Sequence, residues 1–401
     1  MDALTTPLPK DWKKVRLGDI AEIKRGASPR PIENPKWFCA NSNVGWVRIS
    51  DISKNSRFLY KTAQKLSKKG IEKSRFIKQN SLIMSMCATI GKPIITKIDT
   101  CIHDGFVVFE NPKIDLNYLY YFLCYIEKEW LESGQQGSQV NLNVDLIKNK
   151  EVFCPKDLNE QRAIANVLSD VDHYLYSLDA LILKKESVKK ALSFELLSQR
   201  KRLKGFNQAW QKVRLGDICE FGNGEAYETL IVENGDFKLI SLNSIDIDGN
   251  LKNTMKRVNF YDNSLKQDDI VMVLSDVAHG DFLGLCAVIP SNDYVLNQRM
   301  GRLRKKNDCI NILFLRLYIN ANQKYFKMQG QGSSQLNLSK KAIEDFEILL
   351  PPLNEQAAIA NILSDLDSEI TSLKNKKRQF ENIKKALNHD LMSAKIRVLK
   401  E

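Results

Sequence analysis

The sequence predicts an α+β protein: two mixed α/β domains in tandem, separated by two long helices that pack as an antiparallel coiled coil, with pseudo-two-fold symmetry. Three observations support this fold class. The chain repeats itself in two halves of nearly equal length, short β-branched and apolar runs mark strands in each half, and a forty-residue coiled-coil pattern ends each half. Together they predict a duplicated module.

The repeat is carried by four segments that recur in the same order. WKKVRLGDIAEIKRG (12–26) matches WQKVRLGDICEFGNG (210–224) at ten of fifteen positions, and LNEQRAIANVLSDVD (158–172) matches LNEQAAIANILSDLD (353–367) at twelve of fifteen. GQQGSQVNLN returns as GQGSSQLNLS, and VKKALSFELLS as IKKALNHDLMS. The offsets of 198, 196, 195 and 195 residues are too long for a solenoid repeat and indicate one duplicated domain-sized unit.

The segments between the repeats, 27–133 and 225–329, share little sequence; HDGF (103–106), for instance, corresponds to NQRM (297–300). We call these variable parts the heads. Short runs bounded by turn residues predict several strands in each head: VGWVRI, SLIMSM, PIITKI and GFVVFE in the first, FKLISL, DIVMVL and LCAVIP in the second. One helix is expected over 115–133 and another over 311–329. Divergent heads on a repeated frame indicate that each head recognises something different.

The repeated LNEQ segment opens a long helix in each half. Apolar residues follow at steps of three and four, which is the pattern of a coiled-coil seam, and neither proline nor glycine interrupts 158–198 or 353–393. Forty residues at 1.5 Å each make a rod of roughly 60 Å. Lys377 stands where the first copy has Ile182, so we expect the seam to open to solvent there. We also expect the LNEQ segments to be exposed and to face partners.

The net charge of +12 favours a polyanionic partner. No apolar stretch reaches the roughly 20 residues of a membrane span, and the first residues do not resemble a signal peptide, so we expect a cytoplasmic protein without a membrane partner. The eight cysteines are scattered singly and the four histidines form no ligand motif. This spacing predicts reduced thiols and no metal site.

Catalytic motifs are missing from the sequence. We find no phosphate-binding G-x-x-x-x-G-K-[ST] loop, no complete dinucleotide fingerprint, no [DN]-P-P-[YFW] of amino-methyltransferases and no G-x-S-x-G serine. We interpret Asp51, Asp99, Asp268 and Asp269 as solvated acids at strand ends and not as a nuclease site. The sequence therefore predicts no catalytic residues and no cofactor in this chain.

The sequence has more features of a binding protein than of an enzyme. Residues 54–97 hold eleven Lys or Arg and a single acid, Glu72. Such a cluster attracts nucleic-acid phosphates, whereas base edges are read by Arg, Lys, Asn, Gln or Ser. The candidates for DNA contact are Lys54, Asn55, Arg57, Lys61, Lys68, Lys69, Arg75, Thr89 and Lys92 in the first head, and Asn243, Lys256, Arg257, Ser275, His279, Arg299 and Arg302 in the second.

The duplicated order of W-x-x-V-x-L-G-D-I, head, G-Q-[QG]-[GS]-S-Q-x-N-L, strand, L-N-E-Q-x-A-I-A-x-[VI]-L-S-D-x-D and long helix resembles the specificity subunit of type I restriction-modification systems, over roughly residues 12–398. The resemblance implies a first target-recognition domain (1–157), a first spacer helix (158–200), a second target-recognition domain (201–352) and a second spacer helix (353–401). Each domain would recognise one half of a bipartite site in double-stranded DNA, with the helices setting the spacing and docking modification subunits.

The same resemblance implies partners that carry the chemistry. Two modification subunits would bind S-adenosylmethionine and methylate adenine, and restriction subunits would use ATP and Mg²⁺ for cleavage. Two alternatives remain open from the residues alone. One is a stand-alone bivalent DNA-binding protein without a methylating partner, and the other is an enzyme in its own right, against which the missing motifs count.

Overall fold

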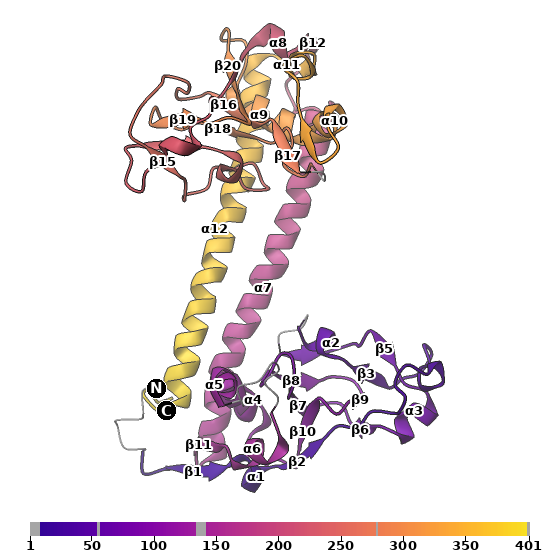
Figure 1. Cartoon of the computed structure of the whole chain (residues 1–401). Coiled ribbons are helices and arrows are strands. Elements are labelled where there is room, and N and C mark those ends of the chain that lie inside the picture. The colour runs from indigo at the N-terminus through magenta and orange to yellow at the C-terminus, as the bar shows by residue number, and fades with distance from the viewer. Residues whose placement is uncertain (1–8, 54–56, 134–141, 278–279, 399–401) are drawn as a thin grey trace. The chain divides into compact units, whose positions relative to one another are not determined.

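The computed structural model describes residues 9–53, 57–133, 142–277 and 280–398 (Figure 1). The chain forms two compact units, Met1–Asp179 with Asn375–Glu401, and Ala180–Lys374. The long helices α7 (Leu158–Leu197) and α12 (Leu353–Met392) each contribute their first part to one unit and their last part to the other. The units are therefore not the two halves of the sequence, because each contains one head and portions of both long helices.

The head of the first unit holds two sheets and a short strand pair. The larger sheet has the order β2 (Glu22–Arg25), β10 (Phe106–Glu110), β7 (Leu82–Ser85), β8 (Pro93–Thr96) and β4 (Phe58–Leu59). The other has the order β5 (Gln64–Lys65), β3 (Gly45–Val47), β9 (Thr100–Ile102) and β6 (Arg75–Ile77). β1 (Trp12–Arg16) pairs antiparallel with β11 (Glu151–Pro155). The helical segments are α1 (Leu17–Ile20), η1 (Pro35–Trp37), α2 (Ile49–Ser53), α3 (Lys68–Glu72), α4 (Leu116–Tyr125), α5 (Glu127–Ser133) and α6 (Val144–Asn149).

The second head repeats most of this topology, but its described sheets have four and three strands where those of the first head have five and four. One sheet has the order β13 (Cys219–Asn223), β20 (Met300–Lys305), β16 (Ile270–Val273) and β18 (Cys286–Val288), and another has the order β15 (Arg257–Val258), β14 (Phe237–Ile240) and β19 (Tyr294–Leu296). β12 (Gln211–Arg214) pairs with β22 (Glu347–Leu350), and β17 (Ser275–Val277) with β21 (Gln335–Asn337). The helical segments are α8 (Leu215–Ile218), η2 (Glu228–Leu230), η3 (Leu242–Ser244), α9 (Ile312–Ala321), α10 (Gln323–Gln329) and α11 (Lys340–Glu344). Two head sequences with little identity thus form equivalent sheets.

The helical region expected in each head contains a break. The segments 115–133 and 311–329 each form two helices, because Ile126 and Asn322 leave helical geometry with ψ of 4° and 20°. The Tyr318 carbonyl at the end of α9 accepts both the backbone N–H of Asn322 at 3.2 Å and its side-chain amide at 2.8 Å. The prediction of a single helix in each head was therefore wrong, and the break lies at equivalent positions in the two heads.

The core of each unit is completed by both long helices. In the first unit, α4 packs with Ile164 and Leu168 near the start of α7, and with Leu391 and Met392 at the end of α12. In the second unit the long helices exchange places. There α9 packs with Ile359 and Leu363 near the start of α12, and with Leu196 and Leu197 at the end of α7. An amphipathic helix of this length buries its apolar stripe at its two ends in different cores.

The glutamate and glutamine of each repeated LNEQ segment are buried, which corrects the expectation of exposure for these two residues, whereas Leu158 and Leu353 are 44% and 48% exposed. Gln161 and Gln356 are 1% and 0% exposed. Gln356 Nε2 donates to the carbonyls of Cys309 and Pro351 at 3.0 and 2.8 Å, and its Oε1 accepts from the backbone N–H of Asn311, the N-cap of α9, at 2.8 Å. Gln161 binds Pro155 and Asp115, the N-cap of α4, in the same way. Each glutamine joins a strand end, a head helix and a long helix.

The preceding glutamate of each segment is also buried and is neutralised by an arginine. Arg202, which follows α7, donates to both carboxylate oxygens of Glu355 at 3.1 and 2.6 Å, and Trp210 Nε1 donates to Glu355 at 3.1 Å. Arg397, which follows α12, contacts Glu160 at 2.8 Å. A buried carboxylate is tolerated because its oxygens are hydrogen-bonded and its charge is paired.

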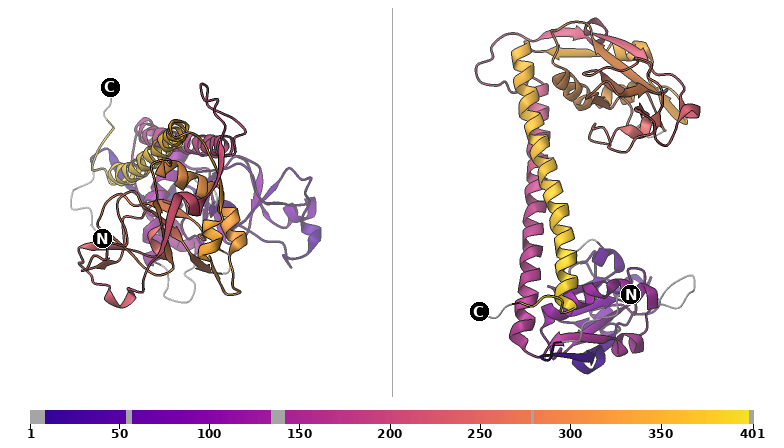
Figure 2. Two further views of the ribbon diagram at one scale, coloured as in Figure 1. Left: turned by 90° about the horizontal axis from the view of Figure 1, so that it is seen from above. Right: turned by 90° about the vertical axis from the view of Figure 1, so that its left-hand side faces the viewer.

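Within each unit, α7 and α12 lie side by side and run antiparallel (Figures 1 and 2). In the first unit the ion pairs are Asp179–Lys377 and Asp172–Lys384, so contacts move forward on one helix as they move back on the other. The second unit has Lys185–Glu369, Glu186–Lys374 and Lys189–Asp367. As expected, the seam is accessible to solvent at Lys377, whose side chain is 32% exposed, and its Nζ lies 2.7 Å from Asp179 Oδ1.

We predict that Gln356→Ala will destabilise the protein by about 1–3 kcal/mol, because a buried N–H and two carbonyls lose their partner. Urea unfolding of the full chain measures the change. The matched control is Asn361→Ala, an exposed site on α12 where we expect a change within about 0.5 kcal/mol. Equal effects of the two substitutions would contradict the structural role of Gln356 in connecting the strand end, the head helix and the long helix.

Candidate nucleic-acid interface

A group of exposed lysines covers one end of the first head. Lys65 on β5, Lys68 and Lys69 on α3, and Lys73 after it are all exposed, as is Lys61 before β5. These elements lie at the end of the head away from α7 (Figure 1). No ion pair joins these lysines to another described residue. We call the five the α3 basic surface; its unpaired charge attracts phosphate.

The fold positions this surface through local capping. Ser67 Oγ accepts from the N–H of Gly70 at 3.3 Å and starts α3, and Gly70 lies so close to Trp37 that an added Cβ would be 2.5 Å from the Trp37 carbonyl oxygen. Trp37 is itself buried. The short helix is therefore held against the head by packing under its lysines, which leaves their amino groups free to face solvent.

A second group of cations in this head was not among the sequence candidates. Arg30 Nη2 donates to Asp104 Oδ2 at 2.8 Å, and Arg25 Nε donates to the Asp104 carbonyl at 2.7 Å. Burial opposes ionisation of Asp104, but the hydrogen bond from Ser28 and the charge of Arg30 outweigh it and lower the pKa of this carboxyl. The signal available in the sequence was the RGASPR segment directly after the repeated W-x-x-V-x-L-G-D-I.

Arg57, in contrast, is a core residue and not a base reader. Its side chain is buried, with 6% of the residue exposed. Its Nη1 donates to Tyr121 Oη at 2.9 Å and to Ser169 Oγ at 2.7 Å, and its Nη2 donates to Asn117 Oδ1 at 2.7 Å. Tyr121 Oη in turn donates to Asp172 of α7 at 2.6 Å. This network connects the head to the long helix, so Arg57 is removed from the DNA candidates.

The remaining candidates of the first head fall into three groups. Arg75 is half-buried and its Nε donates to the Arg25 carbonyl at 2.7 Å. Thr89 and Lys92 lie at a turn between β7 and β8. Lys54 and Asn55 lie outside the described residues, as does the repeated glutamine-rich segment from 134 to 141. Among the described sequence candidates of this head, Lys61, Lys68 and Lys69 of the α3 basic surface are exposed cations without an ion pair.

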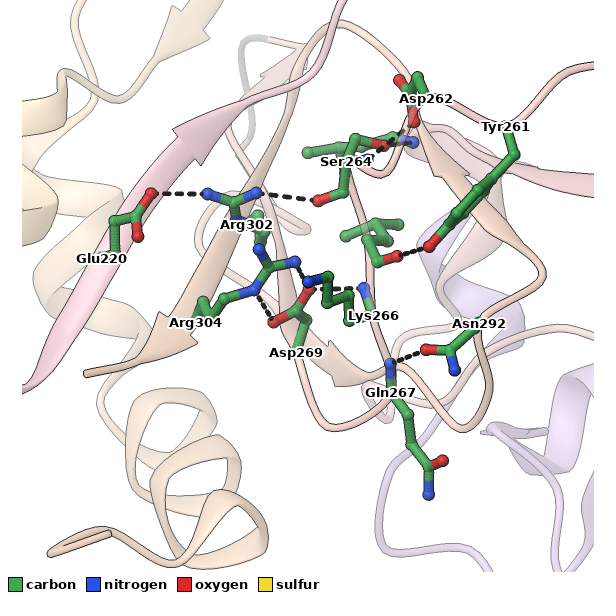
Figure 3. Close-up of polar contacts among 12 residues, drawn as sticks. Glu220, Tyr261, Asp262, Ser264, Lys266, Gln267, Asp269, Asn292, Arg302 and Arg304 are labelled. Carbon is green, nitrogen blue, oxygen red and sulfur yellow. Dashed lines mark hydrogen bonds and ion pairs between the residues drawn. The ribbon is translucent and has the colours of Figure 1, made fainter. Parts of the chain in front are cut away.

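In the second head, the arginines of β20 are held by acids and carbonyls of the same head (Figure 3). Arg302 lies between Glu220, which its Nη2 contacts at 2.9 Å, and the Ser264 carbonyl, to which its Nη1 donates at 3.0 Å. The neighbouring Arg304 forms a bidentate pair with Asp269 at 2.8 and 2.6 Å. Asp269 is buried and not solvated as expected, so this pair is structural. Arg302 is a weaker DNA candidate than its charge suggested.

Two other candidates of this head are also engaged. Ser275 is buried and its Oγ donates to Asn337 Oδ1 at 2.5 Å, which corrects its assignment as a base-reading residue. Arg257 is half-buried and donates to the Gly235 carbonyl at 2.9 Å. His279 lies outside the described residues.

Asn243, Lys256 and Arg299 are the candidates of the second head that the structure places on the surface. Arg299 has a left-handed backbone with φ of 68°, in the loop that precedes β20. The adjoining Asn297 and Gln298 both donate to Glu228, at 2.8 and 2.9 Å. The loop is therefore anchored on its inner side, and Arg299 is held outward from it.

Among the described residues, no group of His, Cys, Asp and Glu is suited to a metal ion, and none of their helices is long and apolar enough to span a membrane. Asp51, expected to be solvated, is buried and accepts from the backbone N–H groups of Arg48 and Ala63 at 2.9 and 3.0 Å. Burial raises the pKa of Cys101 to about 11 and of Cys219 to about 12, so these thiols are neutral near pH 7.

A family model described as the type I restriction modification DNA specificity domain matches this chain twice, over residues 9–185 and 207–382. The chain belongs to this family. It carries two tandem specificity domains, and each match covers one head and most of the long helix that follows it in the sequence. The resemblance seen in the sequence is thereby confirmed.

Individual relatives agree over nearly the whole length. The type I restriction enzyme MjaVIII specificity subunit of Methanocaldococcus jannaschii is 26% identical over 421 residues, which cover 98% of this chain and 94% of the relative. The type I restriction-modification S subunit from M. genitalium shares the fold with a TM-score of 0.63 at 17% identity, covering 96% of this chain and 98% of that one. A chain from a structure describing complex assembly and conformational transition of the type I system gives a TM-score of 0.60 at 15% identity, with the same coverage.

We predict that Lys68→Glu with Lys69→Glu will weaken DNA binding by the full chain and reduce the slope of log affinity against log salt by about 2, because two phosphate contacts are lost. Fluorescence anisotropy with duplexes of different sequence measures both quantities. The control is Lys128→Glu with Lys148→Glu, which makes the same charge change at exposed lysines on α5 and α6. If the control reduced the slope equally, the α3 basic surface would have no special role.

Proposed function

We propose that this chain is the non-catalytic DNA-recognition subunit of a type I restriction-modification complex, in which each head recognises one half of a bipartite site. The observation that carries the proposal is the double match to the DNA specificity domain. The two heads have equivalent sheets but different loop residues, such as His103-Asp104-Gly105 in one and Asn297-Gln298-Arg299 at the corresponding loop of the other. Two heads with equivalent sheets and different loop residues can recognise two different half-sites.

The catalytic steps would belong to partner proteins. Two equivalent copies of the module offer two equivalent binding surfaces, which supports the binding of two modification subunits. Those subunits would bind S-adenosylmethionine and methylate adenine, and restriction subunits would supply cleavage that depends on ATP and Mg²⁺. In this arrangement the chain contributes DNA recognition and geometry in the cytoplasm, and holds no cofactor itself.

The long helices would set the distance between the half-sites. Each has 40 residues, or roughly 60 Å at 1.5 Å per residue. Interhelical ion pairs in each unit fix the register of the pair. Because the register is fixed by specific side chains, the helices would tolerate only a narrow range of half-site spacings.

Co-expression with a modification subunit encoded beside this chain tests the proposal. We expect methylation of mixed-sequence DNA only when both proteins are present, at a bipartite motif found by mapping modified adenines. The Lys68→Glu, Lys69→Glu variant should retain the motif but methylate less. DNA binding by this chain without any complex or methylation would instead support a stand-alone bivalent DNA-binding protein.

A second prediction concerns spacing. Seven residues inserted after Leu178 and seven after the equivalent Leu373 preserve the heptad pattern. The added length of about 10 Å corresponds to about 3 base pairs. We expect a longer spacer between unchanged half-sites in methylation mapping, with insertion after Leu178 alone as the mismatched control. Altered half-site bases would contradict the spacer role.

A further inference from the structure

The helix pair contains a contact that duplication has preserved. Asp172 of α7 pairs with Lys384 of α12 in the first unit, with 2.5 Å between the charged atoms. In the second unit Lys189 of α7 pairs with Asp367 of α12. Adding 195 to Asp172 and Lys189 gives 367 and 384, so the two ion pairs are the same contact made twice. These preserved pairs would also form between two copies of one helix.

The centre of the helix pair does not obey this symmetry. Position 179 is aspartate but its equivalent is Lys374, and position 182 is isoleucine but its equivalent is Lys377. In the first unit Lys377 Nζ lies 2.7 Å from Asp179 Oδ1. In the second unit Lys374 Nζ lies 2.7 Å from Glu186 Oε1. Both central ion pairs therefore need one acid from α7 and one lysine from α12.

The residues around these pairs also depend on unlike helices. Lys185 binds Glu369 at 2.8 Å in the second unit, whereas the equivalent positions in the first unit are Phe380 and Tyr174, whose rings lie 4.5 Å apart. Hydrogen bonds from Lys374 and Lys377 to the acids raise the pKa of both lysines, so both are charged at neutral pH. Across the helix pair, the acids that these two charges meet come from α7.

Pairing of like helices would place like charges together at this centre. If α7 packed against a second α7 in the register seen here, Glu186 would face Asp179, because Asp179 occupies the position equivalent to Lys374. If α12 packed against a second α12, Lys377 would face Lys374, although Lys374 would keep an acid partner in Glu381, the equivalent of Glu186. Like charges at such distances are destabilising, and the apolar seam alone does not discriminate between the two helices.

We propose that positions 179, 182, 374 and 377 form a charge code that makes α7 select α12 and reject a second copy of itself. The preserved apolar seam and outer ion pairs allow any two of these helices to associate, and the central charges restrict that association to the unlike pair. This role does not depend on DNA recognition. It accounts for the divergence of the centre within helices whose starts are nearly identical.

Three variants of the full chain test the code. Lys374→Asp with Lys377→Ile gives α12 the central residues of α7, and Asp179→Lys with Ile182→Lys gives α7 those of α12. Each of these two variants reproduces the contacts of a like pair. We expect each to lower the Tm by about 2–4 °C at low salt, and the loss to shrink in 1 M NaCl because the repulsion is screened.

The decisive variant combines all four substitutions. It restores the central ion pairs with the lysines now on α7 and the acids on α12. The lysine introduced at position 182 then faces the aspartate introduced at position 374, and the lysine introduced at position 179 lies near Glu381. These are the contacts that the pseudo-symmetry makes equivalent to Asp179–Lys377 and Glu186–Lys374. We therefore expect the Tm of the combined variant to return to within about 1 °C of the unmodified chain.

The matched control is Lys184→Ile with Lys190→Asp. It changes the net charge as much as Lys374→Asp with Lys377→Ile, but at exposed positions of α7, and should not move the Tm by more than about 1 °C. Additive losses in the combined variant would overturn the proposal, as would equal losses in the control.

Discussion

The buried glutamine near the start of each long helix is the interaction on which the rest of the structure depends. Gln161 and Gln356 each satisfy a strand-end carbonyl and the N-cap backbone of a head helix with one side chain. Buried amides of this kind are costly to lose because their partners have no access to water. Through these hydrogen bonds, one side chain on the long helix is fixed to the strand end and to the start of the head helix.

Each core also requires the far end of the other long helix. Leu391 and Met392 complete the first core, and Leu196 and Leu197 complete the second. Arg397 and Arg202 then neutralise the buried glutamates at the helix starts. A head therefore cannot form its full core from its own half of the sequence.

The parts that the two halves share and the parts in which they differ therefore occupy different places in each unit. The parts that diverged, such as the loop with Arg299 and the α3 basic surface, project from sheets whose topology is shared. Under the proposed function, a change in these parts would alter what a head recognises without disturbing the hydrogen bonds that connect the head to the helices. The central charges of the helix pair are the exception, since they diverged inside the frame and there serve to distinguish the two helices.

The sequence by itself determined the fold class, the duplication and the family, because repeated motifs and apolar periodicity are properties of the chain that survive without coordinates. Helix starts at Leu158 and Leu353 followed from the repeated LNEQ segments. Only the tertiary structure decided which charged residues are free. Arg57, Ser275 and Arg302 had the side chains of DNA-binding residues, but long-range partners at Tyr121, Asn337 and Glu220 engage them. Such partners lie up to 82 residues apart in sequence, a separation at which local patterns carry no information about burial or pairing.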